Sequence, residues 1–300
     1  MPEHDHRPPR PPARPFEPRM ARPAPVDFAT GPLDEKDAAE LRALKQQIQN
    51  AAGFCCEGYK ERVLRRRIAV RMRALGVRAY AEYAALLEQD TAEYDRLLDV
   101  VTINVSKFFR NAPTWAMLRD NVLPELFALE TPVVNIWSAG TAAGEEAYSM
   151  AILLLQHAAR TGARLDRFRI LGTDVDANAL ARARHGEYPD FAFAEMSSAT
   201  RTRWFEGPKR CRVRPEVRAL VRFASFDLMN DAMPVGQHLV FCRNVLIYFE
   251  KNVQERLFRG FHDALVPGGW LQLGKVETLL GCAPTLFRTV SARERLFRRP

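Results

Sequence analysis

The 300-residue chain has few cysteines and no long apolar segment. Its five cysteines are odd in number and form no C-x-x-C pair, which argues against both a disulfide framework and a zinc cage. The most apolar stretch, residues 151–155, is far shorter than the roughly 20 residues that a membrane-spanning helix needs. No apolar segment near the N-terminus has the form of a secretion signal. These absences favour a reduced, cytoplasmic protein without a structural metal.

The length and composition fit two globular domains and a tail. Hydrophobic residues make up 47% of the chain and charged residues 27%, which excludes wholesale disorder. Ten of the twenty prolines lie in residues 1–32, so we predict a disordered tail there. Residues 33–111 contain no proline and have apolar residues at helical spacing. This pattern predicts a small all-helical domain followed by a linker.

Strand patterns alternate with helix patterns over residues 112–300, which predicts an α/β domain with a mainly parallel sheet covered on both faces. The last two strands, near 286–289 and 295–298, should pair antiparallel. The alternation breaks over 188–224, where we predict an inserted antiparallel β-subdomain that includes the run 220–224. Four other apolar runs have the pattern of buried strands: 133–139, 169–173, 238–242 and 270–273.

The net charge of +8 is concentrated in two segments. Residues 59–78 carry a net charge of +7, and residues 201–222 carry a net charge of +6. In the first segment, helical periodicity places apolar residues on one face and arginines on the neighbouring face. Arginines at this density repel one another unless a partner balances them, so the stripe indicates a polyanionic partner. Its members are Arg62, Arg65, Arg66 and Arg73.

A glycine loop, GTAAG at 140–144, follows the first predicted strand and precedes a helix. This geometry binds adenosine cofactors at the carboxyl ends of parallel strands. The spacing is not G-x-G-x-x-G, and Glu145 and Glu146 follow directly, so a pyrophosphate would be repelled and a dehydrogenase is disfavoured. S-adenosylmethionine has no phosphate and carries a positive charge. Asp174, at the end of the second strand, is placed to accept hydrogen bonds from its ribose.

Four motifs then identify a resemblance. They are TINVSKFFR at 102–110, IWSAGTAAGEEAYS at 136–149, GTDVD at 172–176 and FCRNVLIYF at 241–249. Together they make residues 34–300 similar to the chemotaxis receptor methyltransferases, the CheR family. The resemblance implies transfer of a methyl group from S-adenosylmethionine to glutamate side chains of chemoreceptors, which gives glutamyl methyl esters and S-adenosylhomocysteine. It also implies a Rossmann-like methyltransferase sheet with an inserted β-subdomain, preceded by a helical domain.

The resemblance further implies which residues contact the cofactor. They are Asn104, Ser106, Arg110, Glu146, Asp174, Asp227, Leu228, Arg243 and Asn244. Ser106 stands where the family usually has threonine and offers the same hydroxyl. Asp227 stands where the family usually has asparagine. Near the C-terminus, the family's usual His-Ser-Glu is Lys275-Val276-Glu277.

Arg110 and Tyr248 are the expected catalytic residues. A glutamate carboxylate is already ionised at pH 7, so it needs no general base to attack a sulfonium methyl group. The site must instead place the carboxylate in line with the methyl group and remove water from it. We hypothesise that Arg110 pairs with the substrate carboxylate and that Tyr248 orients it by hydrogen bonding.

The expected partner is the cytoplasmic helix bundle of a methyl-accepting chemoreceptor, docked on the arginine stripe. The protein is expected to be a monomer located at membrane-bound receptor arrays through protein contacts, without membrane insertion or nucleic-acid binding. Some family members hold a receptor's C-terminal pentapeptide with a glycine-rich insertion in the β-subdomain. The corresponding segment here, residues 205–213, is too short for that insertion, so we predict no such tether.

Two other functions remain open from the sequence. A nucleic-acid methyltransferase is encouraged by the net charge, but the chain lacks the Asp/Asn-Pro-Pro-Tyr motif and has no aromatic stacking set beside its basic helix. A non-catalytic module that binds S-adenosylmethionine and acts as a signalling scaffold is allowed by the changes at Asp227 and Lys275. Methyl transfer to receptor, tRNA and DNA distinguishes these alternatives.

Overall fold

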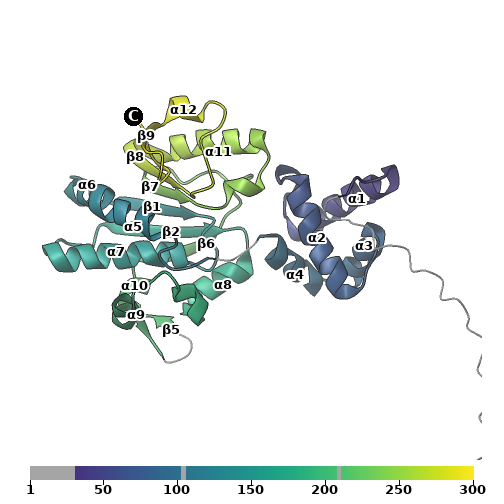
Figure 1. Ribbon diagram of the computed structural model, residues 1–300, viewed down its shortest axis with the longest axis horizontal. Helices are drawn as coiled ribbons and strands as arrows, with labels where there is room; N and C mark the ends of the chain where they lie inside the picture. The colour runs from purple at the N-terminus through teal and green to yellow at the C-terminus, as the bar shows by residue number, and fades with distance from the viewer. Residues whose placement is uncertain (1–30, 103–105, 208–210) are drawn as a thin grey trace, which may run out of the picture.

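The computed structural model describes residues 31–102, 106–207 and 211–300 (Figure 1). The predicted tail lies almost wholly outside these ranges. In Figure 1 a helical domain lies beside a larger sheet domain. Among the described residues, no helix is both long and apolar enough to cross a membrane.

In the described part of the chain, the first domain consists of four α-helices and the short 3₁₀ helix η1 Cys56–Gly58 around one apolar core. Buried residues such as Leu44, Ile48, Leu64 and Ile68 recur at helical spacing and meet in this core. A buried acid, Glu93, accepts two hydrogen bonds of 2.7 Å from Arg71 and one of 2.9 Å from the Tyr83 hydroxyl, and these bonds lower the pKa of its carboxyl. The helices are α1 Glu35–Ala52, α2 Glu61–Leu75, α3 Tyr80–Gln89 and α4 Ala92–Val101.

The second domain contains a seven-stranded sheet in the order β6-β2-β1-β7-β8-β10-β9. Neighbouring strands pair parallel from β6 to β8, and β10 pairs antiparallel with both β8 and β9. The predicted α/β fold class and the antiparallel last strands are therefore confirmed. The strands are β1 Val134–Ala139, β2 Phe168–Asp174, β6 Val221–Ser225, β7 Gln237–Cys242, β8 Leu265–Leu273, β9 Arg288–Ser291 and β10 Leu296–Arg298.

Helices cover both faces of this sheet. Along β1, Ile136 points into one apolar cluster and Trp137 into the other, because side chains alternate between the faces of a strand. The ring centroids of Trp137 and Phe261 in α11 (Lys251–Ala264) lie 5.8 Å apart, whereas Ile136 shares its cluster with Ile152 in α7 (Glu145–Thr161). The helices are α5 Ala112–Met117, α6 Leu123–Ala128, α7 Glu145–Thr161, α8 Ala177–His185, α10 Pro215–Arg218, α11 Lys251–Ala264 and α12 Ala283–Leu286, with a π-helical turn η2 Leu118–Val122 between α5 and α6.

A small antiparallel sheet is inserted between α8 and β6. Its order is β3-β5-β4, formed by β3 Glu187–Tyr188, β5 Cys211–Val213 and β4 Phe205–Glu206, with η3 Asp190–Phe193 and α9 Ser198–Trp204 packed beside it. The predicted extent of this insertion is wrong at its end. The run 220–224 forms β6, which pairs parallel with β2 in the large sheet, with Val221 opposite Ile170. Val221 is buried in the main core, so this run completes the large sheet.

The helical domain contacts the sheet domain at the carboxyl ends of its strands. Tyr59, just before α2, forms an isolated antiparallel bridge with Phe249, and their ring centroids lie 4.8 Å apart. The backbone N–H of Lys60 donates to the Tyr248 carbonyl at 2.8 Å. On the other side, the Thr102 hydroxyl donates to Asp176 at 2.8 Å. These contacts place the start of α2 at the edge where the strands end.

Candidate active site at the carboxyl ends of the strands

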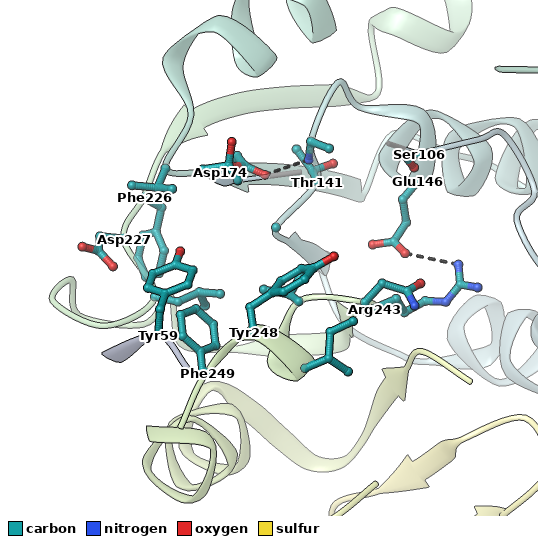
Figure 2. A pocket seen from close by; sticks show the side chains of 18 of the residues that line it. Tyr59, Ser106, Thr141, Glu146, Asp174, Phe226, Asp227, Arg243, Tyr248 and Phe249 are labelled. Atoms are coloured by element: carbon teal, nitrogen blue, oxygen red, sulfur yellow. Dashed lines mark hydrogen bonds and ion pairs between the residues drawn. The ribbon is translucent and has the colours of Figure 1, made fainter. Parts of the chain in front are cut away.

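A cavity of about 220 Å³ lies between the two domains at this edge (Figure 2). Tyr248 extends into its middle, with Glu146 and Arg243 on one side and Asp174, Phe226 and Asp227 on the other. The following residues predicted from the sequence line the cavity: Ser106, Arg110, Glu146, Asp174, Asp227, Leu228, Arg243, Asn244 and Tyr248. Asn104 lies outside the described residues.

The glycine loop forms one wall through a close backbone approach. Gly140 donates its N–H to the Thr173 carbonyl at 2.8 Å and has a φ of +72°. A Cβ atom at this position would lie 2.4 Å from Cγ2 of Val245. Glycine therefore lets the loop after β1 pack directly against the loop after β7, which brings both into one cavity.

Glu146 is a buried carboxylate in the first turn of α7. Its Oε1 accepts from the Ser138 hydroxyl at 2.8 Å, and its Oε2 lies 3.3 Å from Nη1 of Arg243. Burial raises the pKa of Glu146, while the Arg243 charge and the Ser138 hydrogen bond oppose that rise. Glu145, its neighbour, is also buried, but its Oε2 has no hydrogen-bond partner within the part of the chain that the structure describes. Glu146, and not Glu145, is among the residues that line the cavity.

Asp174 ends β2 and is held by backbone N–H groups. Its Oδ2 accepts from Ala142 at 2.8 Å, and its Oδ1 accepts from Asp176 at 3.1 Å. Burial raises the pKa of Asp174, and these backbone bonds oppose the rise. Asp176 caps the N-terminus of α8, because its side chain accepts from the Ala179 N–H at 2.9 Å. Asp174 is therefore fixed in place and keeps lone pairs for further donors.

Asp227 organises the turn that bounds the cavity opposite Glu146. Its Oδ1 accepts from the Met229 N–H at 2.8 Å, and its Oδ2 accepts from the Asn230 side chain at 2.7 Å. The first of these bonds requires only a side-chain oxygen that accepts, which both aspartate and asparagine provide. The replacement of the family's usual asparagine is thus compatible with this turn.

Tyr248 lies at the end of the 3₁₀ turn η4 Leu246–Tyr248 and is half buried. Burial raises its pKa, and the charges of Arg67 and Arg110 act in the opposite direction. The Arg110 backbone carbonyl accepts from Nη2 of Arg243 at 2.7 Å, which ties the linker to the loop after β7. The two expected catalytic side chains therefore line one cavity and are electrostatically coupled.

Some lining residues belong to none of the four motifs. They include Tyr59 and Phe226. Tyr59 belongs to the helical domain and lies at the cavity beside Phe249, which is far along the chain and packs against its ring. Burial raises the pKa of Tyr59 well above its ordinary value. The rings of Tyr59, Phe226 and Phe249 provide the apolar walls that a purine requires, although no local motif marks the first two.

The basic helix presents fewer arginines than predicted. Arg62, Arg66 and Arg73 are exposed, but Arg65 is only 7% exposed. Its Nη2 donates to the Gly31 carbonyl at 2.6 Å, and its Nη1 lies 3.9 Å from Glu61. The prediction that Arg65 is part of the docking surface is therefore wrong, because the segment before α1 covers it.

The lining fits S-adenosylmethionine better than a phosphate-bearing cofactor. Glu146 and Asp174 place two carboxylates on the cavity, where they would repel a pyrophosphate and favour a cation. The close-packed Gly140 and the aromatic walls leave a compact space for an adenosine group. The chemistry of these donors and acceptors therefore agrees with the cofactor expected from the sequence.

Known proteins are similar to this chain over most of its length. Residues 39–102 match the CheR methyltransferase all-alpha domain, and residues 104–296 match the CheR methyltransferase SAM binding domain. The chemotaxis protein methyltransferase of Listeria innocua is 34% identical over 226 residues, which cover 75% of this chain and 84% of that protein. A probable chemotaxis protein methyltransferase of Rhizobium etli is 33% identical over 253 residues, with 81% and 94% covered. The chemotaxis protein methyltransferase of Klebsiella aerogenes is 33% identical over 249 residues, with 80% and 83% covered.

Proposed function

The chain belongs to the CheR methyltransferase family, and from this premise we propose that it methylates glutamate side chains of chemoreceptors to give glutamyl methyl esters. Its cofactor is S-adenosylmethionine. The observation that carries the proposal is one cavity that combines the buried acids Glu146 and Asp174 with Arg110 and Tyr248. The names of the curated relatives favour neither a nucleic-acid methyltransferase nor a non-catalytic scaffold.

The buried acids are proposed to hold the cofactor. Bound S-adenosylmethionine supplies an electrophilic methyl group on a positively charged sulfur. Glu146 keeps a carboxylate at the cavity because Arg243 and Ser138 partly offset the cost of burying its charge. Asp174, fixed by two backbone N–H groups, is placed to accept hydrogen bonds from ribose hydroxyls. Ser106 and Asn244 also line the cavity and are proposed to contact the cofactor.

Arg110 and Tyr248 are proposed to bind the substrate carboxylate. Because burial raises the pKa of Tyr248, its phenol stays protonated at neutral pH and can donate a hydrogen bond to an anionic oxygen. Arg110 supplies the positive charge that compensates the carboxylate as it leaves water. The acid is already ionised, so these residues orient it and exclude water without accepting a proton from it.

The receptor is proposed to dock on the exposed arginines of α2. Arg62, Arg66 and Arg73 lie on a helix that begins two residues after Tyr59, which lines the cavity. A receptor helix bundle with acidic methylation sites would therefore meet positive charge beside the site of reaction. In the β-subdomain, residues 208–210 lie outside the described residues. The predicted absence of a pentapeptide tether and the predicted monomeric state remain proposals.

The test is methyl transfer from tritiated S-adenosylmethionine to three acceptors: a chemoreceptor cytoplasmic fragment, tRNA and DNA. We expect label on the receptor that is released as methanol by mild base, since esters hydrolyse under conditions that leave N-methyl groups intact. Mass spectrometry should place the added methyl on glutamate. Transfer to a nucleic acid alone, or base-stable label on the receptor, would overturn the proposal.

Arg110→Ala tests the proposed substrate contact within the same assay. We expect this variant to bind S-adenosylmethionine and to lose most of its turnover, because the carboxylate loses its charged partner. Arg164→Ala, which removes an exposed arginine paired with Asp166, is the matched control. Near wild-type turnover by Arg110→Ala would contradict the catalytic role.

A further inference from the structure

Glu277 is a buried acid outside the cavity lining, and its exposed fraction is 3%. Its carboxylate accepts four backbone hydrogen bonds. Oε2 accepts from Gly274 at 2.7 Å and from Asn244 at 2.8 Å, while Oε1 accepts from Val245 and Leu246, each at 2.8 Å. Three of these four donors are consecutive residues of the loop after β7.

This loop carries residues of the candidate active site. Asn244 and Val245 line the cavity, and Leu246 begins the 3₁₀ turn that ends at Tyr248. Asn244 has a φ of +62°, in the left-handed region that non-glycine residues seldom adopt. A strained backbone persists only where the surrounding structure holds it. The Glu277 carboxylate holds the backbone of Asn244, Val245 and Leu246, which lead into the turn that ends at Tyr248.

Gly274 makes the close contact possible. A Cβ atom on Gly274 would lie 2.7 Å from Oε2 of Glu277 and 2.8 Å from the Asn244 nitrogen. The missing side chain lets the carboxylate and the loop approach each other at this point. The contact therefore depends both on the Glu277 carboxylate and on the absence of a side chain at Gly274.

The two residues before Glu277 have different surroundings. The Nζ atom of Lys275 lies 2.5 Å from Oε2 of Glu294, and Val276 is 69% exposed. The change from the family's usual His-Ser-Glu to Lys275-Val276-Glu277 thus leaves unchanged the residue that holds the loop.

We propose that Glu277 is a positioning residue for methyl transfer, which fixes the loop after β7 and thereby the placement of the Tyr248 hydroxyl in the active site. The inference rests on the proposed function. Four donors converge on two oxygens, so an amide cannot replace the carboxylate. Glutamine offers one accepting oxygen and turns its own N–H groups toward backbone donors.

The primary variant is Glu277→Gln, and the matched control is Glu294→Gln. Glu294 is a buried acid in the turn between β9 and β10; it is 4% exposed, and its side chain bonds Thr114 and Lys275. Measurements are the S-adenosylmethionine affinity by calorimetry, the melting temperature, kcat and KM for the receptor, and hydrogen exchange of the loop amides. The cofactor affinity and the exchange do not depend on whether glutamate is the methyl acceptor.

We expect Glu277→Gln to lower kcat by about 30-fold with a change in receptor KM of less than about threefold, since the loss is in positioning rather than docking. Exchange of the 245–248 amides should rise in this variant and stay at the wild-type level in Glu294→Gln. In a Tyr248→Phe background, Glu277→Gln should cost less than about threefold in kcat, because the group that it positions is already absent.

Equal losses of kcat in the wild-type and Tyr248→Phe backgrounds would overturn the proposal, as would a kcat for Glu277→Gln equal to that of Glu294→Gln. If Glu277→Gln does not fold, Glu277→Asp enters the same cycle, since it keeps the charge and shortens the reach. A wild-type protein that methylates no glutamate refutes the proposed function instead. In that case the exchange data alone decide whether Glu277 holds the loop.

Discussion

The Nη2 atom of Arg243 donates a 2.7 Å hydrogen bond to the backbone carbonyl oxygen of Arg110. Through its Nη1 atom, the same guanidinium lies 3.3 Å from the buried Glu146 carboxylate. Arg243 therefore connects the residue proposed to bind the cofactor with the segment that carries the residue proposed to bind the substrate. The position of Glu146 and the position of the Arg110 segment are therefore linked through one side chain.

Arg243→Ala should destabilise the fold and weaken cofactor binding. Removing one partner of a buried ion pair leaves a buried charge without compensation, which costs about 3 kcal/mol of unfolding free energy. Because Arg243 opposes the rise of the Glu146 pKa, its loss should raise that pKa further. The destabilisation should then be larger at pH 8, where the acid ionises, than at pH 5.

Urea unfolding at both pH values measures this effect, and calorimetry measures the affinity for S-adenosylmethionine. Arg164→Ala serves again as the control, because Arg164 is 84% exposed in its side chain. A loss of stability that is the same at pH 5 and pH 8 would show that the charge of Glu146 is not the cause.

We predict a second pH dependence of the unfolding free energy, which arises from Glu145. Burial raises the pKa of its carboxyl from the ordinary 4.5 to about 7, with the Arg182 charge acting against the rise. Between these values the folded protein binds more protons than the unfolded chain, so the unfolding free energy falls as pH rises from 4.5 to 7. Glu145→Gln should remove this slope and stabilise the protein at pH 8 by on the order of 2 kcal/mol.

Denaturation of Glu145→Gln and wild type from pH 4.5 to 8 checks the prediction. Glu216→Gln, which changes an exposed acid of α10, is the control for loss of one negative charge. Parallel stability curves for wild type and Glu145→Gln would mean that the buried carboxyl titrates at its ordinary value.

The β-sheet framework was predictable because local patterns encode it, whereas most of the cavity lining was expected only from the motifs that resemble the CheR family. Buried strands appear as apolar runs, and the Asp176 cap appears as an acid directly before a helix. The end of the insertion was not predictable in this way. The run 220–224 is short and lies beside charged residues, and only its pairing with β2 assigns β6 to the large sheet. Strand pairing between distant segments has no local signature.

Three errors or omissions have the same physical origin, which is a contact between segments that are distant in the sequence. Helical angles group Arg65 with the exposed arginines, but they contain no information about Gly31, whose carbonyl covers it. Tyr59 enters the cavity through its contact with Phe249. Glu277 binds only backbone N–H groups, which every non-proline residue has, so no residue type marks its partners.

Tyr248→Phe should lower kcat without weakening cofactor binding. The phenol is proposed to donate a hydrogen bond to the substrate carboxylate, and loss of one such bond at a reacting group costs about 10-fold to 100-fold in turnover. Burial raises the Tyr248 pKa, so the wild-type rate should also stay constant from pH 7.5 to 9.5. The measurements are single-turnover methylation over this range and calorimetry with S-adenosylmethionine. A rate that falls with an apparent pKa below 9 would contradict a protonated Tyr248 as the donor.

The final prediction concerns the exposed arginines of α2 and distinguishes a role in receptor docking from a role in catalysis. Reversing three charges, in Arg62→Glu/Arg66→Glu/Arg73→Glu, should raise the receptor KM by at least about tenfold, because positive charge beside the cavity would be replaced by charge that repels an acidic helix bundle. kcat at saturating receptor should change by less than about threefold, because none of the three residues lines the cavity.

The matched control reverses three exposed arginines of the second basic segment, in Arg203→Glu/Arg212→Glu/Arg222→Glu, which changes the net charge by the same amount. If local charge on α2 guides docking, this control should leave KM within about threefold of wild type. Added salt should raise the wild-type KM and have little effect on the α2 variant, because counterions screen an attraction that the variant lacks. Equal KM changes in both triple variants would instead assign docking to the overall net charge. In that case, α2 would be a solvated helix face and the receptor contact would lie elsewhere.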